Sequence, residues 1–228
     1  MARQKENVFL NLGINVVLPS ILLMKLGDFL PISPLAVLGI SLLPPLLYGL
    51  WDVWKRKKYN FFSILGLVSI ILTGGLGLLQ LSGIWLAIKE ASIPLLIGIV
   101  IASTAVVGKP LFATLLKEIL AYDKLHQRLE LTNNQSNYQK MLNAATFALA
   151  GTLVFSAVMN FFIARSIVVS EAGSPQFNQE LAQMNLISYP MIVIPSFIMI
   201  AIIMYVVMTK LTKYTGVQIE ELLLEEGK

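Results

Sequence analysis

The sequence predicts an all-α, polytopic integral membrane protein with six transmembrane helices. Of its 228 residues, 56% are hydrophobic and only 13% are charged, whereas ordinary soluble domains carry about 25% charged residues. Several uncharged windows reach 17 residues or more, which is long enough to cross the hydrocarbon layer of a bilayer as a helix. The apolar runs are continuous and do not alternate, so helices are favoured over the strands of a membrane barrel.

Six apolar segments are the expected spans, and each has close to the ~20 residues that a ~30 Å hydrocarbon layer requires. They cover about 8–24, 35–53, 61–81, 91–107, 141–163 and 190–209. Together they form one transmembrane domain over residues 1–210, with a polar cytoplasmic connection at 109–140 and a cytoplasmic acidic tail at 211–228. Gly173, Ser174 and Pro175 predict a loop at 170–188.

The basic residues determine the expected orientation. With six spans, 14 of the 17 lysines and arginines lie on one face, and the other face holds only Lys25, Lys89 and Arg165. Because cytoplasmic loops retain basic residues, we expect both termini to lie in the cytoplasm. The first span follows Arg3 and Lys5 but has no small-x-small cleavage site, which predicts a retained signal-anchor helix.

Two basic segments border the expected spans. A cluster that follows the second span contacts lipid head groups or acts only as a topology anchor, and it consists of Lys55, Arg56, Lys57 and Lys58. After the fourth span, Gly108 and Pro110 break the helix beside Lys109. The segment 111–120 then has an apolar stripe with Lys117 and Glu118 outside it, which predicts a helix lying along the interface with its stripe in lipid or against the bundle. A surface for a partner protein is the alternative at this segment.

Few polar groups lie within or beside the expected spans. The asparagines among them either form hydrogen bonds between helices, worth ~0.5–2 kcal/mol each, or line a polar pocket, and they are Asn11, Asn15, Asn143 and Asn160. Lys89 and Glu90 stand in a short stretch, 84–90, expected near the non-cytoplasmic interface. They mark a loop there, or Lys89 contacts a substrate.

Prolines and small residues predict how the helices bend and pack. Pro44 and Pro45 should kink the second span, and Pro19 and Pro195 should perturb the first and the sixth. Small residues at helical spacing predict close helix contacts in two stripes, which are Gly98, Ala102 and Ala105 in the fourth span and Ala144, Ala148 and Gly151 in the fifth.

Composition also excludes several kinds of site. The chain has no cysteine and a single histidine, His126, so disulfides, thiolate metal sites and histidine-rich metal sites are not expected. No catalytic constellation, phosphate-cradling glycine loop or cofactor motif is present. The net charge of +4 fits topology and lipid head groups better than nucleic acid. We therefore expect no metal, no cofactor and no enzyme, with an intramembrane enzyme as the alternative.

Several motifs follow one another along the chain, and they are the basic run after the second span, Lys89, 108–111, 116–118, 142–145 and 160–164. Over roughly residues 5–165, these motifs resemble those of the bacterial intracellular septation protein A family and its septation-protein-like relatives. A longer loop at 170–188, a proline-containing sixth span and the acidic tail depart from the family and place the chain on a divergent branch. The resemblance implies an inner-membrane protein of envelope synthesis or septation that acts through protein partners, without established catalysis.

Two functions therefore stand beside each other. The first is a non-enzymatic membrane protein that contacts lipids and works with envelope or division proteins, with a homo-oligomer left open. The alternative is a small transporter or lipid-handling protein with a pocket among the kinked helices. An enclosed polar cavity that reaches Asn15, Lys89 or Asn160 would favour the alternative, whereas a dry core would favour the first.

Overall fold

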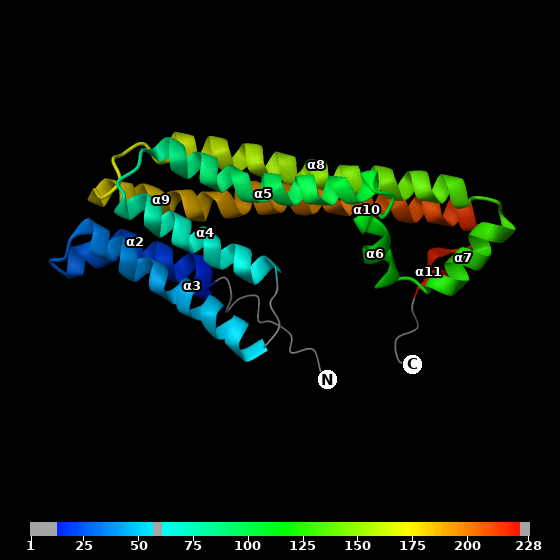
Figure 1. The fold of residues 1–228 in the computed structure, drawn as a ribbon, viewed down its shortest axis with the longest axis horizontal. Helices are drawn as coiled ribbons and strands as arrows, with labels where there is room; N and C mark the ends of the chain where they lie inside the picture. Colours follow the sequence, from blue (N-terminus) through cyan, green and yellow to red (C-terminus); the bar gives the residue numbers. More distant parts are fainter. Residues whose placement is uncertain (1–12, 57–60, 224–228) are drawn as a thin grey trace. The chain divides into compact units, whose positions relative to one another are not determined.

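The computed structural model describes residues 13–56 and 61–223, and in these ranges every regular element is helical (Figure 1). This confirms the all-α class. Within the described residues, four helices are long and apolar enough to cross a membrane, and they cover Pro34–Trp51, Gly83–Val106, Gln135–Ile167 and Pro175–Thr215.

The helices follow one another with short connections. The N-terminal part contains the π-helical turn η1 (Gly13–Val17), α2 (Leu18–Phe29), α3 (Pro34–Arg56) and α4 (Phe61–Leu78). The middle of the chain forms α5 (Gly83–Val106), α6 (Leu111–Lys117), α7 (Tyr122–Leu131) and α8 (Gln135–Ile167). The C-terminal part forms α9 (Pro175–Ser188), the π-helical turn η2 (Tyr189–Val193), α10 (Ile194–Thr215) and α11 (Ile219–Leu222).

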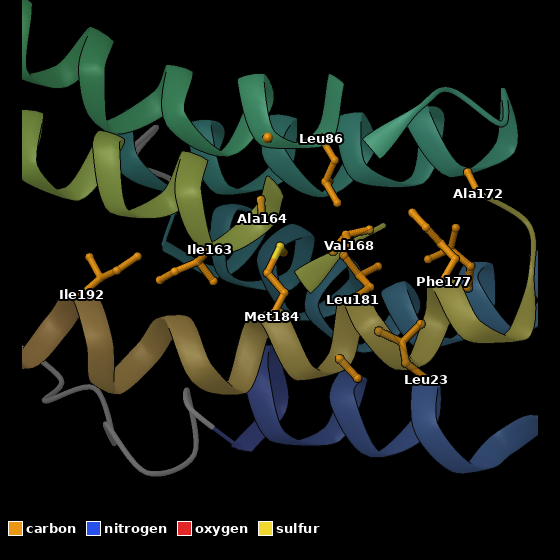
Figure 2. Close-up of a cluster of buried hydrophobic side chains, with 13 residues drawn as sticks. Leu23, Leu86, Ile163, Ala164, Val168, Ala172, Phe177, Leu181, Met184 and Ile192 are labelled. Carbon is orange, nitrogen blue, oxygen red and sulfur yellow. The ribbon is translucent and has the colours of Figure 1, made fainter. Parts of the chain in front are cut away.

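The chain divides into two compact units. Unit 1 combines the residues up to Ile93 with Ala157–Val193, and unit 2 combines Pro94–Ser156 with the residues from Ile194 onward. Each unit has its own cluster of buried apolar side chains. In unit 1, side chains of α9 meet those of α2, the start of α5 and the end of α8 (Figure 2). The most deeply buried large residues of that cluster are Leu38, Val168 and Leu181.

The prediction of a loop over 170–188 is wrong, because α9 occupies most of this segment. Ser174 caps this helix by accepting a hydrogen bond from Phe177 N at 3.1 Å, and Pro175 stands at its first position. The carboxylate of Glu180 accepts hydrogen bonds from the backbone N–H groups of Val169 and Ser170. The Ser-Pro pair is therefore a helix start, and the helical chain continues from Pro175 to Thr215 over 41 residues.

The expected start of the fourth span is also wrong. We predicted it near residue 91, but α5 begins at Gly83, so the stretch 84–90 is helical and continuous with the span. At this start α5 comes very close to the end of α8. A Cβ atom on Gly83 would lie 2.6 Å from the carbonyl oxygen of Val168, and only glycine leaves room for that approach.

Pro19 and Pro195 each lie two residues after a π-helical turn, which confirms the expected perturbations. A proline ring clashes with the carbonyl four residues earlier. For Pro19 that residue is Asn15, the centre of η1, and for Pro195 it is Met191, the centre of η2. The wider turn relieves the clash without ending the helix. In contrast, α3 is α-helical through Pro44 and Pro45.

The helix predicted for 111–120 is confirmed only in part. It ends at Lys117, and Glu118 is its C-cap. Its apolar stripe packs into the core of unit 2, where Phe112, Leu116 and Leu120 are buried together with side chains of α7, α8, α10 and α11. The stripe therefore packs against other helices of the chain, which is the second of the two arrangements predicted for it.

One of the two predicted packing stripes is confirmed. A Cβ on Gly98 would lie 3.3 Å from the Ala150 carbonyl oxygen and from Leu153 Cβ, so α5 and α8 pack closely in unit 2. The stripe of Ala144 and Ala148 is wrong because both are exposed, while Ala145 and Ala150 are buried. The contact face of α8 is thus rotated from the one that small residues alone suggested.

We predict that Gly83→Ala destabilises the protein by about 1–3 kcal/mol, because the new methyl group meets a backbone oxygen that cannot rotate away. The matched control is Gly39→Ala in α3, where no atom lies within 4 Å of the added Cβ and a better helix former should be neutral or slightly stabilising. Thermal unfolding in detergent measures both. Equal stability of the two variants would contradict the close approach.

Candidate functional site

Unit 2 contains a pocket of about 490 Å³ between the turn after α5, the helices α6 and α7, and the first two turns of α8. Residues from three separate segments line it, and they are Gly108, Lys109, Pro110, Ala113, Thr114, Lys117, Tyr122, His126, Leu129, Gln135, Tyr138, Gln139 and Leu142. Two lysines are the charged members of this lining, and it includes no aspartate or glutamate. The pocket therefore offers positive charge and many hydrogen-bond donors.

Local backbone interactions hold the pocket wall in place. Gly108 has a φ of +78°, a conformation that glycine adopts without strain, and it turns the chain away from α5. Thr104 Oγ1 then accepts a hydrogen bond from Leu111 N at 3.0 Å, and Thr146 Oγ1 accepts one from Phe112 N at 3.2 Å. These two hydroxyl groups satisfy N–H donors at the start of α6, which has no side-chain cap of its own.

Three rings form an aromatic side of the pocket. The Tyr122 and His126 ring centroids lie 3.9 Å apart with the ring planes tilted by 40°, and His126 meets Tyr138 edge to face at 6.0 Å. His126 Nδ1 lies 3.2 Å from the carbonyl oxygen of Tyr122. Because that oxygen can only accept, the contact places a hydrogen on Nδ1. The ammonium group of Lys117 lies 4.3 Å from the centre of the Tyr122 ring, a cation–π distance that fixes the charge beside the pocket.

A second polar site lies in unit 1, within the apolar helix α5. Lys89 is its seventh residue, roughly 9 Å from its start at about 1.5 Å per residue. Lys89 Nζ donates to Glu90 Oε1 at 2.7 Å and to Thr73 Oγ1 on α4 at 2.8 Å. The side chain of Lys89 is 8% exposed and that of Glu90 is 22% exposed. The loop interpretation is therefore wrong, because both charges are helical and paired.

The structure brings only some of the predicted site residues together. Lys109, Pro110 and Lys117 line the pocket, whereas Glu118 does not. Asn143 accepts a hydrogen bond from Gln139 Nε2 at 3.3 Å beside the pocket.

Asn15 and Asn160 are half-buried in unit 1, and neither is without an interaction partner. Asn11, Lys57 and Lys58 lie outside the described residues, and Lys55 and Arg56 end α3.

Sequence reasoning missed the aromatic and amide members of the pocket. Tyr122 and His126 are four residues apart and share one face of α7, which was a usable signal. Tyr138, Gln135 and Gln139 start α8 and reach the pocket only through the fold. Thr73, which binds Lys89, also carried no sequence signal. Among the described residues no group of histidine, cysteine, aspartate or glutamate could hold a metal ion.

Comparison with family models, curated proteins and solved structures finds no match to the chain. The resemblance to septation proteins therefore stays a prediction from the sequence.

We predict that Lys89→Met lowers the free energy of unfolding by about 1–3 kcal/mol, because it leaves Glu90 without its buried partner. Replacing both groups, as Lys89→Met with Glu90→Gln, should recover most of that loss. The control is Lys25→Met, whose pair with Asp28 is more than 60% exposed (63% and 62%) and should change stability by no more than about 0.5 kcal/mol. Denaturation in detergent measures all three, and a neutral Lys89→Met would contradict the role of the pair.

Proposed function

We propose that this protein is a non-enzymatic, multi-pass protein of the bacterial inner membrane that works in the cell envelope by binding lipids and partner membrane proteins. The proposal includes six spans with both termini in the cytoplasm. Two further helices join the four long apolar ones to make six. They are α4, with 18 residues and no charged side chain, and η1 with α2, over Gly13–Phe29.

One observation carries the membrane location. The apolar side chains of α10 are turned outward, with Phe197 68%, Ile198 55% and Ile202 56% exposed. Only 11% of the most apolar window in Pro175–Thr215 is buried within the chain. Exposing such a continuous apolar surface to water is unfavourable, and large patches of this kind are therefore rare in soluble monomers. Contact with lipid hydrocarbon, or with another membrane protein, removes this surface from water.

The role in envelope synthesis or division is supported by the sequence resemblance described above. Partner proteins would contact the lipid-facing helices, and the chain itself would supply no catalytic group. The lipid-handling alternative is supported by the pocket of unit 2, which lies beside the ends of two apolar helices and not among kinked helices as expected. Its polar lining does not include Asn15, Lys89 or Asn160.

Cysteine labelling tests the topology without background, because the chain has no cysteine of its own. We expect a membrane-impermeant maleimide to label Glu171→Cys on cells whose outer membrane is permeabilised, because this exposed residue precedes α9 on the periplasmic side. Lys213→Cys, exposed near the end of α10, should be labelled only after the inner membrane is opened. Labelling of both, or of neither, before that step would contradict an odd number of crossings between them.

A further inference from the structure

The unit 2 pocket combines three features that point to one kind of ligand. It is concave and open, its charged lining consists of Lys109 and Lys117, and its other walls include aromatic rings, side-chain amides and apolar side chains such as those of Pro110 and Leu142. Within the described chain, neither lysine forms an ion pair with a carboxylate. We propose that this pocket is a binding site for a phosphate group, in which Lys109 and Lys117 neutralise its charge and Tyr138, Gln135 and Gln139 supply hydrogen bonds.

The arrangement of donors favours phosphate over other anions. The lysines come from the turn after α5 and from α6, whereas the amides and the Tyr138 hydroxyl come from the first turns of α8. Donors therefore come from two separate segments of the chain. A carboxylate presents two oxygens in one plane, but a phosphate presents oxygens in several directions and can accept from both segments.

A cationic ligand fits the same pocket poorly. Aromatic rings can bind quaternary ammonium groups, but the face of Tyr122 is already occupied by the ammonium group of Lys117 at 4.3 Å. Two lysines and no lining carboxylate would repel a second cation. The Lys117–Tyr122 contact instead holds a positive charge ready for an anion, which reduces the ordering cost of binding.

The position of the pocket favours a lipid headgroup as the source of the phosphate. Lys109 follows the end of α5 by three residues, and Tyr138 and Leu142 lie in the first turns of α8. The pocket is thus beside the ends of two apolar helices, where lipid phosphates lie if these helices cross the membrane. This step rests on the proposed membrane location, whereas the phosphate chemistry does not. A soluble phosphate compound would use the same donors.

The test compares four forms of the chain in detergent. They are the unchanged chain, the pocket variant Lys109→Ala with Lys117→Ala, the charge-preserving variant Lys109→Arg with Lys117→Arg, and the control Lys140→Ala with Lys213→Ala, which removes two exposed lysines outside the pocket. Native mass spectrometry measures retention of phosphatidylglycerol against phosphatidylcholine. Calorimetric titration with inorganic phosphate and with glycerol 3-phosphate measures the soluble source. Thermal unfolding confirms that all forms are folded.

We expect the pocket variant to bind phosphatidylglycerol about tenfold or more weakly than the unchanged protein and the control. Lys109→Arg with Lys117→Arg, which keeps both charges, should retain binding. Preference for phosphatidylglycerol over both soluble probes supports a lipid headgroup. Binding of the soluble probes without any lipid preference supports the phosphate site and overturns the lipid source, and it leaves the cysteine-labelling result unaffected. Equal loss in the control, or no phosphate binding in either arm, overturns the site.

Discussion

A hydrocarbon layer offers no hydrogen-bond partner, so polar groups in helices that cross it need partners within the protein. Several hydroxyl groups inside the apolar helices bond back to carbonyls of their own helix, as Ser41 does to Val37, Ser92 to Ile88 and Thr146 to Leu142, whereas Ser20 Oγ in α2 is buried without a hydrogen-bond partner among the described residues. Lys89 satisfies the same requirement through Thr73 and Glu90. A charge in such a helix is therefore tolerated when its partners come from the adjacent residue and the neighbouring helix.

The same constraint explains how the helices pass their prolines. Breaking the helix at Pro195 would leave several carbonyl and N–H groups unpaired, whereas one π-helical turn at Tyr189–Val193 leaves the helix continuous from Pro175 to Thr215. The helices α5, α8 and α9–α10 are continuous, and each contributes residues to both compact units. The units are thus defined by packing and not by a break in the chain.

Hydropathy predicted the apolar centres of the helices well but not their ends. A hydropathy scale gives the free energy of transferring each residue into lipid. On that scale the charges of Lys89 and Glu90 predict the end of a span. It contains no information on Thr73, which lies 16 residues away and pairs with Lys89. At Ser174 the error was different, since Ser-Pro is both a turn signal and a helix N-terminus. The Glu180 side chain favours the helix, because it accepts hydrogen bonds from the backbone that precedes α9.

The pocket was only partly predictable because its lining comes from three segments that the core of unit 2 brings together. Basic residues beside a helix break identified Lys109 and Lys117, but Tyr138 and Gln139 gave no such signal.

The apolar stripe of α6 is what joins these segments. Its Phe112 and Leu116 pack against Leu125 of α7 and Leu142 of α8 in one buried cluster. Because that cluster occupies one face of α6 and α7, their other faces, with Lys117, Tyr122 and His126, are left to line the pocket. The stripe that predicted an interfacial helix, in lipid or against the bundle, therefore packs into the core and holds the opposite face of α6 at the pocket. Amphipathicity alone cannot distinguish these two uses, since both bury one face and leave the other to polar surroundings.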